Sequence, residues 1–380
     1  MENRSLSSAI RLYNYIFDSF WNGDAIVGPD PGINFELRLF RFIKSYLAFI
    51  NWPDNYYFLQ TQGYWIKSNW DLFEITGDVN YKKVAIACSN YVINRQRKNG
   101  SWEYPLKSWK KYVSTVEGTW ASLGVLETFK WTKEPKYLEG ALKWYDFLIN
   151  KTGFQRYKDS MAINYFDVPS VWWRLRVPNN TTLVLWFLSE LYRIRNDLRL
   201  PELNGKMIRF IQLAQNNSGE LKYAIERDHY FCYQYNAFEF LDLSHSYKII
   251  NDERIRIILE KLAKFLSTGV TEIGSIKYDC FQTFPEVIHS SGAVGAALAT
   301  ATFMGLSNYD KHIEYTYNFL FERQRQDGSF PNSAHTGPRI RKPISHGFLA
   351  DNRSYPRQLS YILQHLLIKA RLETNLGADH

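Results

Sequence analysis

One turn recurs five times along this chain at a nearly constant interval. In each copy a long helical pattern ends in polar residues and a glycine, and an aromatic residue follows within four positions. The glycines are separated by steps of 53, 66, 55 and 54 residues, and they are Gly100, Gly153, Gly219, Gly274 and Gly328. A repeat of this period is typical of proteins built from similar helical hairpins. We therefore expect a series of like units.

Each unit contains two kinds of helical pattern. The first is apolar almost all round: Gln62–Ile75, Thr115–Trp131, Asn179–Arg195, Tyr233–Ile249, Ser290–Gly305 and Tyr355–Ala370. The second carries charges along one face: Tyr81–Arg95, Pro135–Ile149, Pro201–Gln215, Asp252–Leu266 and Tyr309–Arg323. A helix without a polar face belongs inside a fold, and a helix with a charged stripe belongs outside. Such inner–outer hairpins either stack in an open array or close into a ring.

Residues 1–50 favour the closed ring. They hold two further helical patterns, Ser5–Phe20 and Phe35–Phe49, and one of these can pack beside the last inner helix, which has no outer partner. We therefore predict an all-α protein, an (α/α)6 toroid of inner and outer helical hairpins with short extended turns. Residues 1–380 are expected to form this single domain, with 1–50 as its closing helices. The segment 332–355 has little helical period and is a candidate lid loop.

Composition excludes several classes of protein. The chain is 17% aromatic, 45% hydrophobic and 22% charged, which is too apolar for a disordered chain. The net charge of +8 is spread over small basic clusters, and no nucleic-acid-binding module is recognisable, so no nucleic-acid partner is expected. No run of 18 apolar residues occurs and the N-terminus does not resemble a signal peptide, so we expect a cytoplasmic protein without a membrane span.

The cysteines give no sign of a metal site or a disulfide framework. They are three, far apart and in apolar surroundings: Cys88, Cys232 and Cys280. Buried, small hydrophobic side chains are the expected role. Glu286 and His289 have the i,i+3 spacing of two metal ligands, but further ligands are missing. We expect no cofactor and no metal, and the sequence leaves the oligomeric state open.

Two of the repeated turns resemble those of a known group of proteins. Gln96–Trp102 reads QRKNGSW and Gln324–Phe330 reads QRQDGSF. With the inner–outer alternation, these turns resemble the six-hairpin toroid superfamily. That group includes N-acylglucosamine epimerases, unsaturated glucuronyl hydrolases, glucuronyl epimerases, polysaccharide lyases and toroid proteins of exopolysaccharide-biosynthesis clusters. The turns also resemble the QW repeats of triterpene cyclases. The resemblance implies the toroid and a carbohydrate-active protein, and it assigns no residue a role.

The loops that lead into the inner helices are unusually polar and aromatic, and they are the candidate site. The densest is Arg227–Asn236, RDHYFCYQYN, which places Asp228, His229 and Tyr230 beside Tyr233 and Asn236. We interpret His229 and Tyr233 as a general acid/base pair, with Tyr230 and Asn236 contacting a sugar. A core of hydrogen-bonded tyrosines around a histidine would produce the same pattern.

Glu117 or Asp228 is predicted to act as the second acid/base group. Glu117 interrupts an otherwise apolar inner helix, so its burial would need a reason. The alternative is a glutamate in a first helical turn, stabilised by the helix dipole. Asp228 and His289 stand at two other such loops, and His289 is a candidate substrate contact.

Flat and cationic side chains complete the predicted site. Sugars stack on aromatic rings, and guanidinium groups hold carboxylates through two bonds. The candidate stacking residues are Trp65, Trp120, Trp172 and Trp173, and the candidate carboxylate holders are Arg174 and Arg353. For the arginines, a solvated basic loop is the alternative.

Three functions follow from this pattern. The first is a glycan hydrolase, lyase or epimerase acting on an acidic or N-acetylated sugar in a central aromatic funnel. The second is a non-catalytic toroid that binds a glycan or a protein partner. The third is a lipid-binding ring like the terpenoid cyclases, although the chain lacks their Asp-x-Asp-Asp and Asp-Asp-x-x-Asp motifs. Fold alone does not choose among them.

Overall fold

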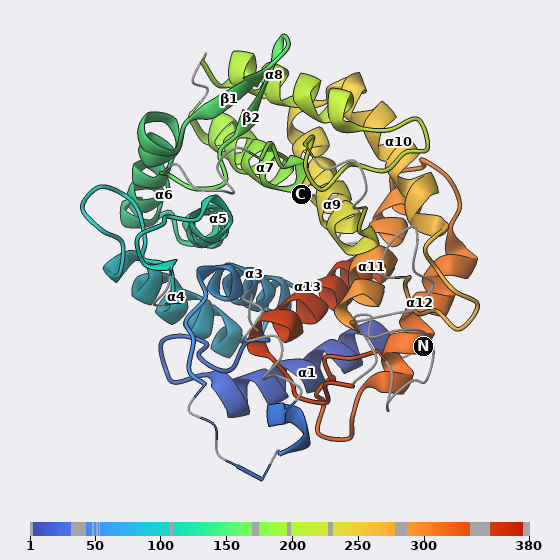
Figure 1. The fold of residues 1–380 in the computed structure, drawn as a ribbon. Coiled ribbons are helices and arrows are strands. Elements are labelled where there is room, and N and C mark those ends of the chain that lie inside the picture. Colours follow the sequence, from blue (N-terminus) through green and yellow to red (C-terminus); the bar gives the residue numbers. More distant parts are fainter. Residues whose placement is uncertain are drawn as a thin grey trace.

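The computed structural model describes residues 3–31, 43–47, 49–50, 52, 54–106, 109–168, 175–195, 199–226, 231–277, 287–334 and 350–374. Its helices form two concentric rings (Figure 1). The inner ring consists of α3 (Leu59–Thr76), α5 (Thr115–Thr132), α7 (Pro178–Arg195), α9 (Tyr233–Ile250), α11 (His289–Phe303) and α13 (Pro356–Glu373). Each packs against the next in this order, and α13 packs against α3. The predicted (α/α)6 toroid is confirmed, and the predicted inner helices match to within three residues at each end.

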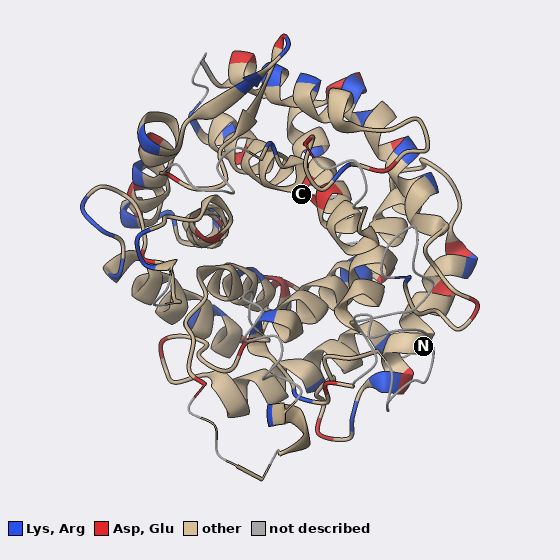
Figure 2. Ribbon diagram, in the orientation of Figure 1, with Lys and Arg blue, Asp and Glu red and all other residues tan. Residues whose placement is uncertain are grey.

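The outer ring carries the charged faces. It consists of α1 (Arg4–Phe20), α4 (Val79–Asn94), α6 (Pro135–Phe147), α8 (Arg199–Ala214), α10 (Glu253–Ser267) and α12 (Asp310–Arg323). Each outer helix from α4 to α12 packs against the inner helix that precedes it, and α1 takes the sixth place beside α13. Figure 2 shows the charged residues concentrated on the outer helices. The first helix of the chain therefore closes the circle.

The five repeat glycines explain how neighbouring units meet. All five have positive φ values, between 69° and 106°, a region that glycine occupies without strain. At Gly100, Gly219 and Gly274, a Cβ atom would collide with a backbone carbonyl of the next outer helix around the ring. At Gly328, it would collide with the carbonyl of Arg11 on α1. The last turn thus meets the first helix as the other turns meet their neighbours.

A glutamine holds three of these turns in place. Nε2 of Gln96 donates to the carbonyl oxygens of Gly100 at 2.9 Å and of Gly140 on α6 at 2.8 Å. Gln215 does the same with Gly219 at 2.9 Å and Ile258 on α10 at 3.0 Å. Gln324 bonds Gly328 at 3.0 Å and Ser8 on α1 at 2.9 Å. The QxxxG pattern is therefore a device that joins adjacent units.

Replacing Gln324 by alanine is expected to destabilise the ring at its closure. The carbonyl oxygens of Gly328 and Ser8 would lose their side-chain donor, at a cost of about 2 kcal/mol in the free energy of unfolding. Urea denaturation measures this loss. The matched control is Gln326→Ala, at an exposed position of the same turn. Equal losses in the two variants would contradict the assigned role.

A β-hairpin interrupts the repeat once. Strands β1 (Phe154–Tyr157) and β2 (Ser160–Ile163) pair antiparallel between α6 and α7, after a five-residue π-helix, η2 (Leu148–Thr152). The hairpin explains why one glycine step is 66 residues. It also explains why Gly153 differs from its equivalents: a Cβ atom at this position would have Nδ2 of Asn164 as its nearest neighbour, at 3.8 Å. The short turn expected here is a longer, folded connection.

Some sequence predictions fall at the edges of the described chain. In Phe35–Phe49, only residues 43–47 and 49 are described, and 43–46 are helical. Residues 335–349 of the candidate lid lie outside the described residues. Cys88 and Cys232 are buried as predicted, and Cys280 is outside the described residues. Among the helices that the structure describes, none is long and apolar enough to cross a membrane.

Candidate functional site

We call the end of the ring at which the six inner helices begin the N-terminal rim. Glu117 is a buried carboxylate at this rim: it is the third residue of α5 and is only 4% exposed. Its Oε2 accepts a hydrogen bond of 2.9 Å from the backbone N–H of Gln60, in the first turn of α3. Phe58, the residue before α3, makes no capping bond through its side chain. Glu117 therefore satisfies an N–H group of a neighbouring helix, where the dipole favours negative charge.

Glu117 is nevertheless not fully ionised at neutral pH. Burial raises its pKa from 4.5 to about 7, although the N–H of Gln60 and the guanidinium of Arg357 act in the opposite direction. A group with this pKa can donate or accept a proton near pH 7, which general acid/base catalysis requires. The alternative interpretation, a glutamate in a first helical turn, also describes its position, because Glu117 is the acidic residue in the first turn of α5.

Arg357 and Asp30 form a charge pair beside Glu117. Nε of Arg357 lies 2.7 Å from Oδ2 of Asp30, and its guanidinium carbon lies 4.4 Å above the ring of Phe58. The side chains are 14% and 2% exposed. Because the pair is buried and matched, the arginine is held in one place near the rim.

An aromatic layer spans the ring just below this rim. Its members are Tyr64, Trp120, Phe238 and Tyr361, each the sixth residue of its inner helix. The ring of Tyr64 lies 3.8 Å from that of Trp120 and 4.8 Å from that of Tyr361, which lies 5.5 Å from Phe238. The hydroxyl of Tyr361 donates to Oε1 of Gln60 at 2.8 Å. The layer is therefore linked to the residue that binds Glu117.

Near the rim and the aromatic layer, four buried polar residues each have one side-chain atom without a hydrogen-bond partner in the described part of the chain. The atoms are Nδ2 of Asn180, Oε2 of Glu239, Nδ1 of His289 and Oε1 of Gln358, from α7, α9, α11 and α13. None of the four residues is more than 8% exposed. Buried polar groups are nearly always paired in folded proteins. Water or a hydroxyl-rich ligand would supply what this group lacks.

Burial also shifts the pKa values of His289 and Glu239 away from their charged forms. Burial, with Arg357, lowers the pKa of His289 to about 3. Burial, with the neighbouring Asp242, raises the pKa of Glu239 well above 4.5. The ring of His289 is 5.8 Å from that of Tyr361. At neutral pH His289 is therefore an uncharged donor and acceptor, and burial favours the uncharged form of Glu239.

Of the predicted site residues, the structure brings Glu117, Trp120 and His289 to the N-terminal rim and the aromatic layer. Trp120 stacks on Tyr64 and also meets Trp186 edge-on, with 5.6 Å between ring centroids. His289 is the first residue of α11 and contacts Tyr361. Their predicted roles toward a substrate stay predictions.

Two other predicted site residues pack against helices of the outer ring. Trp65 stacks on Tyr13 of α1, with 4.6 Å between ring centroids. Tyr233 stacks on Phe265 of α10, also at 4.6 Å. Both rings therefore contribute to the contact between the inner and outer helices.

Asn236 and Arg353, two further predicted site residues, bond to segments outside the helices. The side chain of Asn236 bonds both the N–H and the carbonyl of Leu221, at 2.7 Å and 3.1 Å. Arg353 bonds Oδ2 of Asp54 at 3.1 Å. The first contact attaches residue 221 to α9, and the second joins residue 54 to the segment that precedes α13. The remaining predicted site residues lie outside the described residues: Trp172, Trp173, Arg174, Asp228, His229 and Tyr230.

Sequence reasoning does not single out Tyr64 and Tyr361. Aligning the inner helices by their starts would find them, since aromatic residues occupy the sixth position in four of the six. Within the described residues, no group of three or more His, Cys, Asp or Glu side chains is placed to hold a metal ion.

These features define a class by fold: the chain is an (α/α)6 toroid. It is similar to the solved cellobiose 2-epimerase of Bacillus thermoamylovorans, with a TM-score of 0.71 and 11% identity over 96% of this chain and 99% of that one. It is also similar to a family 76 glycoside hydrolase from a bovine Bacteroides thetaiotaomicron strain, with a TM-score of 0.70 and 10% identity, covering 97% of this chain and 78% of that one.

A third similar structure is a glycosyl hydrolase family 88 protein from Bacteroides vulgatus. The TM-score is 0.63 and the identity 13%, over 88% of this chain and 97% of that one. No protein-family model and no curated protein matches the sequence. The likeness to these enzymes is thus one of architecture.

Proposed function

We propose that this protein is an enzyme that acts on a carbohydrate bound at the N-terminal rim. The reaction is hydrolysis, β-elimination or epimerisation. The observation that carries the proposal is Glu117, a buried carboxyl group whose pKa is about 7, next to a layer of aromatic rings. Solved toroids of similar architecture include a 2-epimerase, a polysaccharide lyase and glycoside hydrolases, which supports the class of substrate.

The three reactions share one requirement, a proton donor or acceptor positioned at the sugar. Protonated Glu117 would give its proton to a leaving oxygen, or its carboxylate would take a proton from a sugar carbon. Trp120 and Tyr64 would stack on the apolar face of a sugar ring. Asn180, His289 and Gln358 have unpaired atoms that suit the sugar's hydroxyl groups. His229 and Asp228 remain sequence-based candidates for a further acid/base group, whereas Tyr233, predicted to pair with His229, packs against Phe265 of α10.

The charge of the sugar is a separate part of the proposal. The sequence favours an acidic or N-acetylated sugar. Of the described arginines near the rim, Arg353 and Arg357 already bond Asp54 and Asp30. An acidic sugar would therefore depend on Arg174, and the described rim suits a neutral sugar better.

A substrate screen tests the proposed class. The panel consists of cellobiose, α-1,6-mannotriose, and oligosaccharides containing glucuronate or N-acetylglucosamine. New reducing ends report hydrolysis, ultraviolet absorbance of an unsaturated sugar reports elimination, and NMR of the sugar protons reports epimerisation. Turnover of one member supports the proposal. Binding without turnover across the panel would instead support the non-catalytic toroid, and binding of isoprenoid lipids alone would support the third function.

Replacing Trp120 by alanine is expected to weaken the binding of that substrate. Loss of a stacking face costs about 1–3 kcal/mol, so KM is expected to rise roughly 5- to 150-fold. Steady-state kinetics measure the change, with far-UV circular dichroism as the check on folding. Phe17→Ala is the control, because Phe17 is an aromatic residue of the outer helix α1 and is 37% exposed. An unchanged KM in the Trp120 variant would remove this residue from the site.

A further inference from the structure

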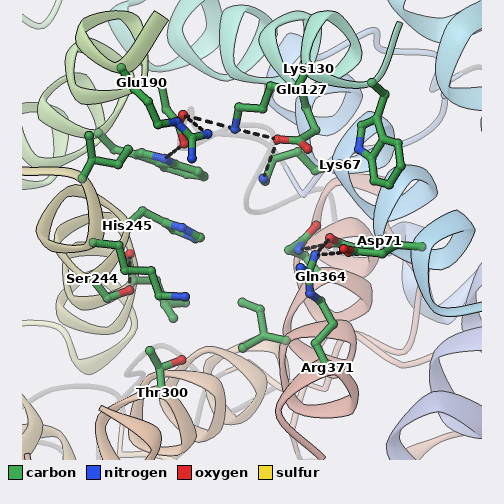
Figure 3. Close-up of a pocket in the computed structure, with 18 of the residues that line it drawn as sticks. Lys67, Asp71, Glu127, Lys130, Glu190, Ser244, His245, Thr300, Gln364 and Arg371 are labelled. Atoms are coloured by element: carbon green, nitrogen blue, oxygen red, sulfur yellow. Dashed lines mark hydrogen bonds and ion pairs between the residues drawn. The ribbon is translucent and has the colours of Figure 1, made fainter. Parts of the chain in front are cut away.

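The ring contains a cavity of about 510 Å³ at the end where the inner helices finish (Figure 3). Its lining comes from all six inner helices. The first lining residues on α3, α7, α9 and α13 are Lys67, Trp186, Leu241 and Gln364, each the ninth residue of its helix. The aromatic layer occupies the sixth position, so this C-terminal cavity lies on the opposite side of the layer from Glu117. Its volume is that of a site for a small molecule.

Among its described residues, the lining of the C-terminal cavity carries more positive than negative charge. Its basic residues are Lys67, Lys130, Lys133, Arg193, Lys248 and Arg371, and its acidic residues are Asp71, Glu74, Glu127 and Glu190. Six positive charges against four negative ones leave an excess of two. In a cavity of low dielectric constant, an excess of one sign of charge produces a strong electrostatic potential of that sign.

Each of the four carboxylates is already held by protein groups. Asp71 accepts from Nε2 of Gln364 at 2.6 Å and pairs with Arg371, which also lies 2.9 Å from Glu74. Figure 3 shows Asp71, Gln364 and Arg371 together on one wall of the cavity.

On α5 and α7, Nζ of Lys130 lies 3.1 Å from both Glu127 and Glu190. Glu190 also accepts from Arg193 at 2.8 Å and from the indole N–H of Trp186 at 3.2 Å. By contrast, Nζ of Lys67 is 3.8 Å from its nearest carboxylate, Glu127. The negative charges are therefore satisfied, and the surplus charge of the lining is cationic.

His245 and Trp186 give the C-terminal cavity a flat surface near these cations. Their rings stack 4.2 Å apart with an interplanar angle of 8°. Nζ of Lys67 lies 5.1 Å from the centre of the Trp186 ring. Burial, together with Lys67, Lys248, Lys130 and Arg371, lowers the pKa of His245 well below 6.5. At neutral pH the ring of His245 is therefore uncharged, and four cationic side chains lie around it. Ser244 and Thr300 add hydroxyl groups to the lining.

We propose that the C-terminal cavity is a second binding site, which takes a small anionic sugar carrying a phosphate or carboxylate group. The anionic group would lie near Lys67, and the sugar ring would lie near the Trp186–His245 stack. The sugar hydroxyl groups would bond Ser244, Thr300 and the polar edges of the charged network. This site is separate from the proposed catalytic one and does not depend on it.

Isothermal titration calorimetry on the full chain tests this site. The probes are glucose 6-phosphate and glucuronate, with glucose as the neutral control and inorganic phosphate as the control for charge alone. We expect at least one anionic sugar to bind at least tenfold more tightly than both controls, and more weakly as salt is raised. The phosphate and carboxylate arms identify the preferred anion. Equal affinity for glucose, or for inorganic phosphate, would overturn the proposal, as would no binding of either anionic sugar.

Variants locate the binding. Lys67→Met is expected to weaken the binding of the anionic sugar at least tenfold, because it removes a cation from the cavity while keeping an apolar stem. The control is Lys264→Met, at an exposed position on α10. Glu117→Gln is expected to bind as the wild type does, so failure of the catalytic proposal leaves this test intact. Wild-type affinity in Lys67→Met would place the sugar elsewhere. If that variant does not fold, Lys67→Gln takes its place and is judged by the same two outcomes.

Discussion

Glutamine in place of Glu117 is expected to lower kcat for the substrate found in the screen by at least about 100-fold. Glutamine keeps the shape of the side chain and can accept the same hydrogen bond from the N–H of Gln60, but it has no proton to exchange. KM is expected to change little. Glu139→Gln, on the exposed face of α6, is the matched control. Full activity in the Glu117 variant would remove this residue from the mechanism.

Glu117→Gln is also expected to change the free energy of unfolding, and the pKa of Glu117 gives the sign of that change. The pKa of Glu117 is about 7 in the folded state and 4.5 in the reference state, so between these values the folded chain binds the extra proton. The wild type therefore loses stability as pH rises from about 4.5 to about 7. Glutamine removes this loss, and Glu117→Gln is expected to be more stable than the wild type by up to about 3 kcal/mol at pH 8. Urea denaturation at pH 5 and pH 8 measures this, and a pH-independent difference between the two proteins would contradict the raised pKa.

Gly328→Ala is expected to destabilise the fold more than any of the other substitutions proposed above. Gly328 has φ of 88°, and a Cβ atom there would collide with the backbone carbonyl of Arg11. The backbone of α1 can yield only by moving away from the last turn, which would open the closure of the ring. We expect a loss of about 3 kcal/mol or more in the free energy of unfolding.

Gly77→Ala separates the collision from the backbone strain. Gly77 also has a positive φ, of 73°, at the end of α3, but a Cβ atom at this position would meet nothing within 4 Å. Its substitution is expected to cost about 1 kcal/mol. Chemical denaturation of the two variants under the same conditions measures the difference. If Gly328→Ala and Gly77→Ala lost the same free energy of unfolding, the contact between the last turn and α1 would not contribute to closing the ring.

Much of the fold could be predicted because its signals are local and repeated. The sequence shows two such signals without any tertiary information. One is the glycine that ends each repeated turn, and the other is the charged face on every second helix. The β-hairpin after Gly153 could not be predicted, because its strands are four residues each and have no strong alternation. Only the longer glycine step indicates an insertion at this point.

The orientation of the inner helices could not be predicted in the same way. Tyr64 and Trp65 are adjacent on α3, and successive residues of a helix point about 100° apart. The sequence favours Trp65 as a stacking residue, but Trp65 packs against Tyr13 of α1, whereas Tyr64 contacts Trp120 and Tyr361 of the two neighbouring inner helices. A helix that is buried on all sides has no polar face to distinguish these directions.

Glu117 could be singled out from the sequence because a charged residue is unusual on an otherwise apolar inner helix. The C-terminal cavity could not, because its contacts join residues far apart in sequence, such as Asp71 with Gln364 and Arg371. Each of these side chains alone is typical of the end of a helix.

The most direct measurement is a crystal structure of Glu117→Gln with the substrate identified by the screen. We predict a sugar ring stacked on Trp120 or Tyr64, with the side chain at position 117 about 3 Å from the atom that gains or loses the proton. A substrate bound only in the C-terminal cavity, or on the outer surface without contact to residue 117, would contradict a catalytic site at the N-terminal rim.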